Sequence, residues 1–369
     1  MPVQSRLSHS AKSLVGAKSL YSFYLLGFML CGSGLRAADW PMWRYDAGRT
    51  AACSAELPGE LHLHWHRKLP PQIPAWKDET SMQFDRSYEP IIVDGLLLVG
   101  STVKERLTAY RLDSGVEAWR FYTEGPIRFA PAAWEGKVYL ASDDGYLYCL
   151  NVNNGRLRWK FRAGPSDRWL FGNERLVSTW PVRGGPVLAD GKVFLAAGVW
   201  PFMGTFIYAL NAETGDVVWS NDSLSFTYRK LPHPGAEGFS GLSPQGYLSV
   251  VGDKLIVPGS RFRPAVLDRN SGKLEYFGRA GSPVVVGRGR YAFAGGRIFR
   301  ADQDYSVKLR EHKRMSAPVL ARDRWYTRNV AVDPASMTLK ETTAEDSSTQ
   351  EKYRLMSGRI KEVATYRGT

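Results

Sequence analysis

Five arginines stand three or four residues ahead of prolines that recur along the chain, and this spacing is the clearest indication of chemistry in the sequence. They are Arg86, Arg128, Arg183, Arg279 and Arg314. A guanidinium group binds a carboxylate through two parallel N–H···O bonds and stacks on aromatic rings. If each proline marks the entry of a strand in a repeated unit, the arginines form a ring. We therefore predict a site for a planar or sugar-like ligand that bears carboxylates.

Three tryptophans belong to the same prediction, because they lie in long segments between the repeated elements. They are Trp169, Trp180 and Trp200. Their rings would supply flat apolar surface beside the arginines. An alternative carries equal weight, since a basic protein has many loop arginines that are solvated or paired. Their candidate partners are Asp167, Glu174 and Glu237.

Catalytic and metal-binding patterns are scarce elsewhere. Three histidines, His62, His64 and His66, share one face of a predicted strand over 61–69, but no nearby carboxylate or cysteine completes a ligand set, so we predict no metal site. The segment 240–243 lacks the GxSxG pattern and its strand-turn-helix context. The adjacent acids Asp143 and Asp144 lie in a predicted tight turn, where aspartate ordinarily has a structural role. Catalytic residues stay unassigned.

The elements that must position these residues are best seen in the stretch 127–161. Its alternating apolar residues and three glycine turns predict four short strands. The third turn, Asn153-Asn154-Gly155, is the strongest hairpin signal, because Asn and Gly tolerate the positive φ that such turns need. One unit of this kind has two open edges and two apolar faces. It therefore requires neighbours.

Two markers repeat through the chain and predict an all-β propeller of four-stranded antiparallel blades. The first is a glycine followed four residues later by an aromatic residue: Gly115 with Trp119, Gly155 with Trp159, Gly215 with Trp219, and Gly272 with Tyr276. The second is the proline at the entry of the first strand: Pro90, Pro131, Pro186, Pro244, Pro283 and Pro318. Six units of roughly forty residues result. Allowing for ring closure through the segment around Trp65, we expect seven or eight blades or an incomplete ring.

The first 38 residues have the layout of a secretory signal peptide: basic residues, the apolar run 20–31 and small residues before a cleavage site near Ala37 or Ala38. An uncleaved membrane anchor is the alternative. The segment holds four basic residues and no acid, so its removal lowers the formal charge from +13 to +9. The chain that remains after cleavage is still basic, which favours acidic partners. Because we expect the protein to be exported, nucleic acid is the least expected of these partners. Two cysteines remain, Cys53 and Cys149, and their pairing is left open.

The propeller is expected to occupy 39–369, with its clearest blades at 88–343, while 344–369 is an uncertain stretch or a partial blade. Propeller connectivity places the links between blades and the turns between second and third strands around one mouth of the channel. Three such segments are expanded: 164–181, 197–205 and 221–242. Long loops on a rigid scaffold are where binding groups accumulate. We therefore expect the binding face at this mouth.

Units such as APAAWEGKVYLASDDGYLYCLNVNNGRLRWKF resemble the pyrroloquinoline quinone (PQQ) repeat of the quinoprotein dehydrogenase-like β-propellers, most strongly over 88–276. The resemblance implies blades locked by tryptophan packing and a periplasmic or cell-surface location. Members include PQQ- and calcium-dependent alcohol dehydrogenases and cofactor-free relatives such as the propeller lipoprotein of the outer-membrane β-barrel assembly machinery. The dehydrogenases carry adjacent cysteines beside the quinone, which this chain lacks, and Asn173-Glu174 is a weak match to their calcium ligands.

The leading hypothesis is a secreted, non-catalytic propeller that acts as a binding or assembly platform through its long-loop face. It would bind a protein partner or an anionic ligand there, with no cofactor assigned. The alternative is a quinoprotein oxidoreductase that uses PQQ and Ca²⁺, with the arginines holding the carboxylates of the cofactor. A third hypothesis makes the propeller a docking module for a catalytic domain further along the chain.

Overall fold

The computed structural model describes residues 38–78, 83–172, 174–230, 237–259, 262–278, 281–303, 305–309, 315–345 and 352–365. The chain divides into two units, Met1–Arg36 and Ala37–Thr369, and all described residues belong to the second. The predicted signal segment up to Ala37 and the arginines Arg279 and Arg314 lie outside the described residues. In the described part, no helix combines the length and hydropathy needed to cross a membrane.

The repeated unit is a four-stranded antiparallel sheet, as predicted. The first unit consists of β1 (Ile91–Val93), β2 (Leu96–Ser101), β3 (Arg106–Arg111) and β4 (Glu117–Tyr122). The second consists of β5 (Ala132–Trp134), β6 (Lys137–Ala141), β7 (Tyr146–Asn151) and β8 (Leu157–Arg162). It corresponds to the stretch 127–161, whose strands and turns were predicted from alternation and glycine placement.

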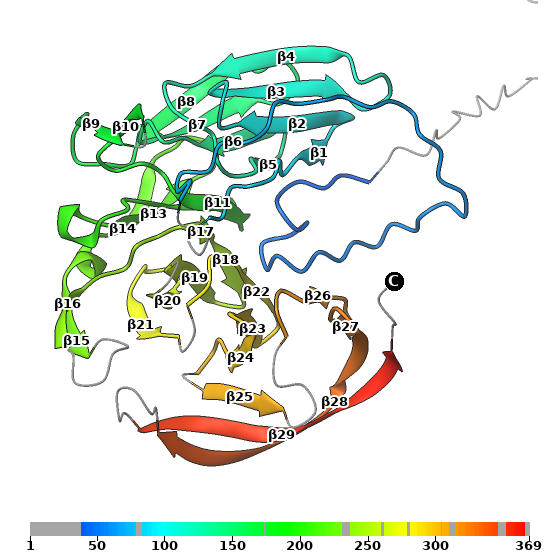
Figure 1. Ribbon diagram of the computed structural model, residues 1–369, viewed down its shortest axis with the longest axis vertical. Coiled ribbons are helices and arrows are strands. Elements are labelled where there is room, and N and C mark those ends of the chain that lie inside the picture. The colour runs from blue at the N-terminus through cyan, green and yellow to red at the C-terminus, as the bar shows by residue number, and fades with distance from the viewer. Residues whose placement is uncertain are drawn as a thin grey trace, which may run out of the picture. The chain divides into compact units, whose positions relative to one another are not determined.

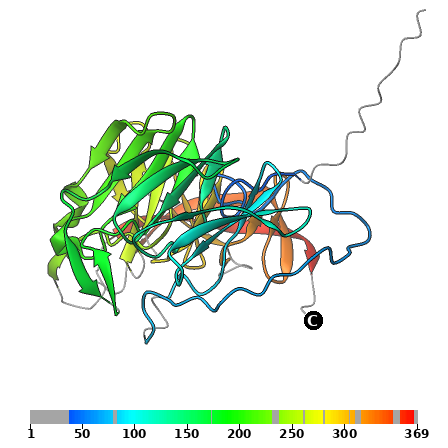
Figure 2. The same ribbon diagram turned by 90° about the horizontal axis from the view of Figure 1, so that it is seen from above.

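Three further units repeat this order, and the sheets follow one another in chain order (Figures 1 and 2). The third consists of β11 (Gly184–Ala189), β12 (Lys192–Ala197), β13 (Phe206–Asn211) and β14 (Val217–Asn221), with β17 (Gly246–Tyr247) added beside β11. The fourth consists of β18 (Ser249–Val251), β19 (Lys254–Gly259), β20 (Phe262–Asp268) and β21 (Leu274–Phe277). The fifth consists of β22 (Val285–Arg288), β23 (Tyr291–Ala294), β24 (Arg297–Arg300) and β25 (Tyr305–Leu309).

The sixth unit departs from the pattern. It consists of β26 (Val319–Leu320), β27 (Trp325–Tyr326), β28 (Val330–Glu345) and β29 (Lys352–Thr365), and β29 pairs in parallel with β25, so that units five and six share one sheet. The stretch after Tyr353 is therefore the last strand of this unit and does not form a sheet of its own. In the part of the chain that the structure describes there are six units, where the sequence predicted seven or eight blades or an incomplete ring.

Neighbouring blades are joined by the predicted tryptophans and glycines. The indole N–H groups of Trp119, Trp159 and Trp219 donate to backbone carbonyls of the next blade at 2.8, 3.0 and 3.0 Å. Each ring lies against the glycine of that blade's last turn: Gly155, Gly215 and Gly272. The residues opposite the tryptophans are small and buried: Ala109, Cys149 and Ala209. Cys149 is thus a packing residue, and both it and exposed Cys53 are free thiols.

The segment 61–69 is not a strand, which corrects the prediction from its alternation. Among the described residues no strand pairs with it, and a lone strand cannot satisfy its backbone groups through a ladder. Trp65 nevertheless makes the contact that joins the blades, since its indole N–H donates to the Leu112 carbonyl at 2.8 Å and its ring lies against Gly115. Leu61 and Leu63 beside it are exposed.

The contact between tryptophan and glycine predicts a measurable difference between two glycines of the second blade. Gly155 has φ +67° and an added Cβ would lie 2.5 Å from the Trp119 ring, whereas Gly136 has φ +71° and no atom within 4 Å of such a Cβ. Both substitutions to alanine carry the strain of a positive φ, about 1–2 kcal/mol. We expect Gly155→Ala to cost about 1–3 kcal/mol more, because the ring must move. Urea unfolding of the two variants measures the difference, and equal losses would contradict it.

Residues 40–50, which we call the hub segment, contact each of the six units in the described part of the chain. Trp40 bridges to Ile92 of the first blade, and the Pro41 carbonyl accepts the Ala133 N–H of the second at 2.7 Å. The Arg49 guanidinium donates to the Pro186 carbonyl of the third at 2.8 Å. Carbonyls of the segment also accept one N–H each from blades four, five and six, at 2.7–2.8 Å: Val250, Gly287 and Leu320. The hub segment therefore ties all six described units together.

Candidate functional site

Two of the predicted arginines converge on one carboxylate. Arg128 precedes β5 and Arg183 precedes β11, and both are buried against Asp143 in the turn between β6 and β7. Arg128 Nε lies 2.6 Å from Asp143 Oδ2, while Arg183 Nε and Nη2 lie 3.1 and 2.9 Å from the two carboxylate oxygens. Sequence reasoning brought these arginines together. It assigned Asp143 only a structural turn role and missed it as their shared partner.

A second carboxylate completes this cluster. Asp85 Oδ2 accepts Arg128 Nη1 at 2.5 Å and the Ala75 backbone N–H at 2.9 Å. The two arginines and two aspartates therefore balance in formal charge. Burial alone would raise the pKa of Asp143, but the guanidiniums of Arg128 and Arg183 outweigh it and hold that pKa below its usual range. The cluster is an internally neutralised network, so its guanidiniums are already bound to carboxylates.

The other described members of the prediction lie apart from the cluster or beside it. Arg86 is exposed and donates to the Gln83 side chain. Trp180 is buried and its indole N–H donates to the Met203 carbonyl at 2.6 Å. Trp169 donates to Asp167 at 3.1 Å. Trp200 is 42% exposed and packs edge-to-face on Trp76, with ring centroids 5.7 Å apart. Asp167, which was proposed as a partner of a loop arginine, therefore accepts a hydrogen bond from the Trp169 indole.

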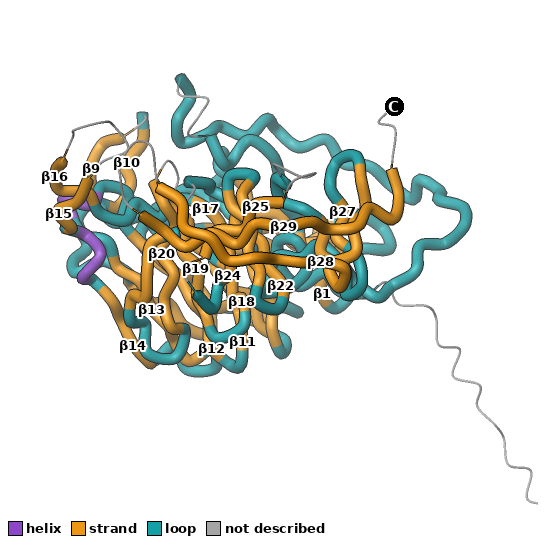
Figure 3. Tube along the Cα trace, turned by 90° about the horizontal axis from the view of Figure 1, so that it is seen from below, coloured by secondary structure: helices purple, strands orange, loops and turns teal. Residues whose placement is uncertain are grey.

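The three expanded segments lie on the same side of the molecule in Figure 3, and Figure 1 shows that their two hairpins are apart along that side. The hairpins are β9 (Trp169–Gly172) with β10 (Arg175–Ser178), and β15 (Thr227–Lys230) with β16 (Glu237–Ser240), and two 3-10 turns belong to the same segments. The turns are η2 (Pro201–Met203) and η3 (Ser223–Ser225), which contact each other. The Thr205 N–H donates to the Ser225 hydroxyl at 2.7 Å. We call this side of the molecule the loop face.

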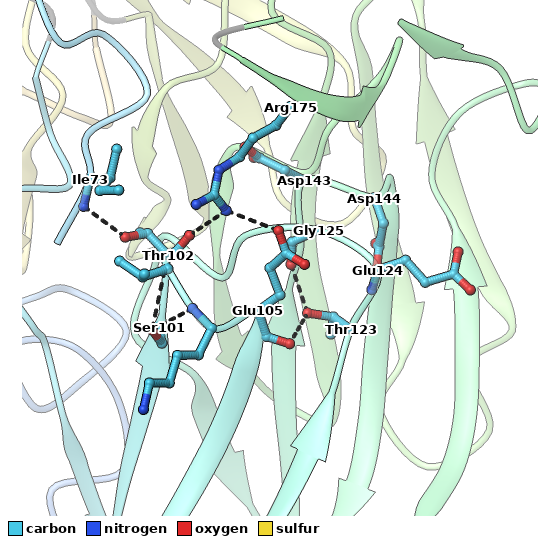
Figure 4. Close-up of polar contacts among 12 residues, drawn as sticks. Ile73, Ser101, Thr102, Glu105, Thr123, Glu124, Gly125, Asp143, Asp144 and Arg175 are labelled. Carbon is cyan, nitrogen blue, oxygen red and sulfur yellow. Dashed lines mark hydrogen bonds and ion pairs between the residues drawn. The ribbon is translucent and has the colours of Figure 1, made fainter. Parts of the chain in front are cut away.

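The β9–β10 hairpin is held to the first blade by polar contacts (Figure 4). Arg175 Nη1 lies 2.9 Å from both the Thr102 carbonyl and the Glu105 carboxylate. Thr102 Oγ1 in turn accepts the Ile73 N–H at 3.0 Å. Because Thr102 and Glu105 lie between β2 and β3, the turn of the first blade belongs to the same face as the hairpin. These contacts fix the hairpin on the scaffold.

The loop face exposes an unusual number of large apolar side chains. Its members, which we call the apolar patch, are Phe171, Leu176, Trp200, Phe202, Phe226 and Tyr228, exposed by 42–75%. Trp200, which precedes η2, and Phe202, which lies within it, stack with ring centroids 6.2 Å apart. Exposed apolar surface that gathers over several loops is typical of interaction sites. Sequence analysis found the loops but did not identify these side chains.

A small hollow opens between the hairpin and η2, which we call the hairpin pocket. It has a volume of about 110 Å³. Its walls are Trp76, Leu170, Gly172, Val177, Ser178, Thr179, Pro181, Arg183, Val199 and Trp200. Thr179 is 2% exposed, and its hydroxyl oxygen has no hydrogen-bond partner among the described residues. A larger hollow of about 470 Å³ lies by the turns between first and second strands, lined by Trp134 and four exposed acids: Asp39, Asp94, Glu135 and Asp190.

Beside the hub segment lies a partly buried acid, Glu89, that the sequence did not single out. Glu89 accepts the Tyr247 hydroxyl proton, and Trp43 stacks on Tyr247 with centroids 4.0 Å apart. Burial raises the pKa of Glu89 to about 7, against a smaller opposing effect of the Tyr247 hydrogen bond and the Arg49 charge. The Arg49 guanidinium lies 5.4 Å from the centre of the Tyr247 ring.

Glu89 gives stability a pH dependence. The unfolded carboxyl releases its proton near pH 4.5 and the folded one near pH 7, so between these values the folded state holds the extra proton. The free energy of unfolding therefore falls as pH rises through this window, by about 3 kcal/mol at most. We expect Glu89→Gln to remove this fall, as measured by urea unfolding at pH 5 and pH 8. Exposed Glu124→Gln is the control, and an unchanged fall in the Glu89 variant would contradict the assignment.

Metal-binding groups do not assemble in the described residues: no three His, Cys, Asp or Glu side chains there are placed to hold a metal ion. His62 is exposed, with its Nε2 3.7 Å from a Glu60 carboxylate oxygen. Asn173 lies outside the described residues, and the Glu174 carboxylate lies 2.6 Å from Lys77 Nζ.

The chain is similar in part to curated alcohol dehydrogenases. It is 29% identical over 180 residues to the dehydrogenase subunit of a quinone-dependent alcohol dehydrogenase of Gluconobacter oxydans. The aligned region covers 45% of this chain and 21% of that protein. It is 27% identical over 155 residues to the quinohemoprotein alcohol dehydrogenase ADH-IIG of Pseudomonas putida, covering 39% and 20%. The chain thus spans about a fifth of the length of the curated relatives it matches.

Two solved structures are similar to the chain with TM-scores below 0.5. BamB from Moraxella catarrhalis matches with a TM-score of 0.44 and 15% identity over 74% of both chains. The quinohemoprotein alcohol dehydrogenase of Comamonas testosteroni matches with a TM-score of 0.46 and 16% identity over 87% of this chain and 52% of that one. The family model described as outer membrane protein assembly factor BamB matches residues 65–168 and 104–305, together more than half of the chain. The chain therefore belongs to the PQQ-like repeat family of β-propellers.

Proposed function

We propose that this protein is a secreted, non-catalytic PQQ-like propeller that serves as a binding or assembly platform and binds a protein partner on its loop face. One observation carries the proposal: the apolar patch, from Phe171 on the hairpin to Phe202 on η2, is exposed on loops that the scaffold holds in place. Aromatic side chains are enriched in protein interfaces and supply much of their binding energy. A patch spread over three loops suits a macromolecular partner better than a small ligand.

The charge cluster supports the same proposal. A carboxylate-bearing ligand needs cations that are available to it, yet Arg128 and Arg183 are bound to Asp143 and Asp85. The hairpin pocket of about 110 Å³ is also smaller than the roughly 300–1,000 Å³ of typical small-molecule sites. The charge cluster and the hairpin pocket thus favour a macromolecular partner over a small carboxylate-bearing ligand on the loop face. Secretion is part of the proposal and is supported by the signal-like first 38 residues.

Site-specific photo-crosslinking tests the platform. A benzophenone amino acid replaces Phe171 or Phe202 in the full chain, and the protein is irradiated in the cells that export it. The controls carry the same group at Val116 or Val217, which are 57% and 49% exposed beside the glycine turns of the blades. We expect a discrete crosslinked partner from the two loop-face positions and none from the controls. Equal crosslinking at all four positions, or at none, would overturn the proposal.

The quinoprotein alternative needs its own experiment, because most curated relatives are quinone-dependent dehydrogenases. Purified protein is titrated with PQQ and Ca²⁺ while quinone absorbance and dye-linked alcohol oxidation are followed. We expect neither saturable binding nor oxidation. Tight binding that Arg183→Ala removes, in a variant that stays folded, would support the alternative and contradict the platform.

A further inference from the structure

Residues 61–69 lie where the fourth strand of a blade would lie, although the structure describes no blade before the first unit. Trp65 repeats two contacts that are made from the fourth strands of the first three units by Trp119, Trp159 and Trp219. Its indole N–H donates to a carbonyl of the next unit, and its ring lies against the glycine of that unit's last turn. We propose that this segment pairs with one β-strand of a partner protein. The inference goes beyond the platform function, because the segment lies outside the apolar patch.

Arg67 supports the correspondence with a fourth strand. It stands two residues after Trp65, and its Nη2 donates to the Gly115 carbonyl at 2.9 Å. Asn221 stands two residues after Trp219, and its Nδ2 donates to the carbonyl of Gly272, the equivalent turn glycine, at 2.7 Å. The segment therefore sits on the first unit in the register of a fourth strand.

The third strand that would pair with the segment is missing from the described part of the chain. In the first three units, the fourth strand is hydrogen-bonded along its length to the third. Among the described residues, no backbone hydrogen bond joins 61–69 to a strand or a loop. Its side chains other than those of Trp65 and Leu69 are exposed. An extended segment with open backbone groups is a template for pairing with another strand.

The chain itself shows which strand fits beside such a tryptophan. The residues opposite the three tryptophans are small, and two positions before each of them stands an aliphatic residue of the core: Leu107 before Ala109, Leu147 before Cys149, and Ile207 before Ala209. The small residue leaves room for the tryptophan ring, and the aliphatic residue packs in the core between blades. We therefore expect an antiparallel partner strand that carries Leu or Ile, then any residue, then Ala or Cys.

The pairing strand has to come from another protein. In all six described units, the third strand is already paired on both edges, so neither this chain nor a second copy of it has a described third strand to spare. A strand that adds to an open edge gains affinity from its main-chain hydrogen bonds and specificity from its alternate side chains. Both terms are available here, because the backbone of 61–69 is open and Trp65 is already in place.

Two peptides with blocked ends and the sequence of β13 test the inference: Lys-Phe-Ile-Tyr-Ala-Leu-Asn-Lys, and the same peptide with Phe in place of Ala. Binding of the fluorescently labelled peptides to the full chain is followed by anisotropy. The indole N–H signal of Trp65, assigned in NMR spectra with Trp65→Phe, locates the contact. We expect the Ala peptide to bind at least about tenfold more tightly, because a second large ring opposite Trp65 overfills the space. Absence of binding, or equal affinity of the two peptides, would overturn the inference.

Adjacent residues of the segment provide matched variants, because successive N–H groups of an extended strand point to opposite edges. Leu63→Pro and His64→Pro each remove one N–H that has no bond in the described structure, so both variants are expected to fold. We expect one of them to weaken binding of the Ala peptide at least about tenfold and the other to leave it within about twofold. Equal affinities of the two variants would contradict strand pairing.

Two further results separate this inference from its neighbours. A dimer of the full chain that the same proline abolishes would assign the open edge to a second copy and overturn the partner strand. Crosslinking at Phe171 and Phe202 tests the platform function independently, because neither proline lies in the apolar patch.

Discussion

Asp143→Asn is expected to lower the free energy of unfolding by about 3–5 kcal/mol, the largest effect of any single change on the loop face. The carboxylate is 1% exposed and binds both Arg128 and Arg183, so its loss leaves two buried guanidiniums with one remaining acid, Asp85. Breaking a buried ion pair from one side costs far more than the pair contributes as a whole, because a charge without its partner stays out of water. Urea unfolding at pH 7 measures the loss.

Asp167→Asn is the matched control, because it removes one carboxylate of the same face from an exposed position. We expect it to change the free energy of unfolding by less than about 0.5 kcal/mol. A second check uses the lowered pKa of Asp143: the contribution of this group is present above its unfolded pKa and is lost as pH falls through the folded value. The difference between wild type and Asp143→Asn should therefore shrink in acid. If Asp143→Asn lowers the free energy of unfolding by less than about 1 kcal/mol at pH 7, the two arginines do not depend on Asp143 for neutralisation.

Arg49→Met is expected to lower the free energy of unfolding by more than about 3 kcal/mol, because it removes three hydrogen bonds that hold the hub segment. The guanidinium is fully buried and donates to carbonyls of Leu248 and Pro186 at 2.9 and 2.8 Å and to that of Trp43 at 3.1 Å. A hydrogen bond from a charged donor contributes about 1.5–3 kcal/mol, and each carbonyl left unpaired adds a desolvation cost. Thermal unfolding and limited proteolysis report the loss.

Two variants sharpen this expectation. Arg49→Lys keeps the charge, but a single ammonium cannot reproduce a planar fork that bonds three carbonyls, so we expect it to recover less than half of the loss. Arg156→Met removes an exposed arginine of the second blade and should leave stability within about 0.5 kcal/mol. If Arg49→Lys proves as stable as the wild type, charge alone explains the role of Arg49 and the geometric account is wrong.

The blades were predictable because their signals are local. The turn at Gly155 and the position of Trp159 four residues later are set by a few adjacent residues, and the structure places both as expected. The segment 61–69 shows the limit of this reasoning. Its alternation indicates a strand, but strand formation depends on a partner that the sequence window does not contain. Trp65 contacts the neighbouring glycine turn without a strand, which the sequence did not predict.

The candidate site was predictable only in part, for the same reason. The spacing of Arg128 and Arg183 from their prolines placed both at one mouth, yet their shared acid, Asp143, comes from a turn 15 and 40 residues away in sequence. The hub segment was even harder to predict from the sequence. Arg44, Tyr45 and Arg49 of the segment, and Ala51 just after it, have positive φ angles that nothing in their residue types predicts. Their conformations are imposed by bonds to blades as distant as Leu320.

The hub segment also constrains the order in which parts of the chain can reach their final contacts during synthesis. Its first partner, Ile92, is synthesised soon after it, while Leu320 follows some 270 residues later than Thr50. A chain that emerges from its N-terminus can therefore build blades one after another, as repeat proteins do, but the centre that joins them stays unfinished until the sixth unit has arrived. The earliest residues of the propeller are thus among the last to reach their final bonds. Arg49 can complete its bonds earlier, once Pro186 and Leu248 have been made, while the Thr50 carbonyl waits for the Leu320 N–H.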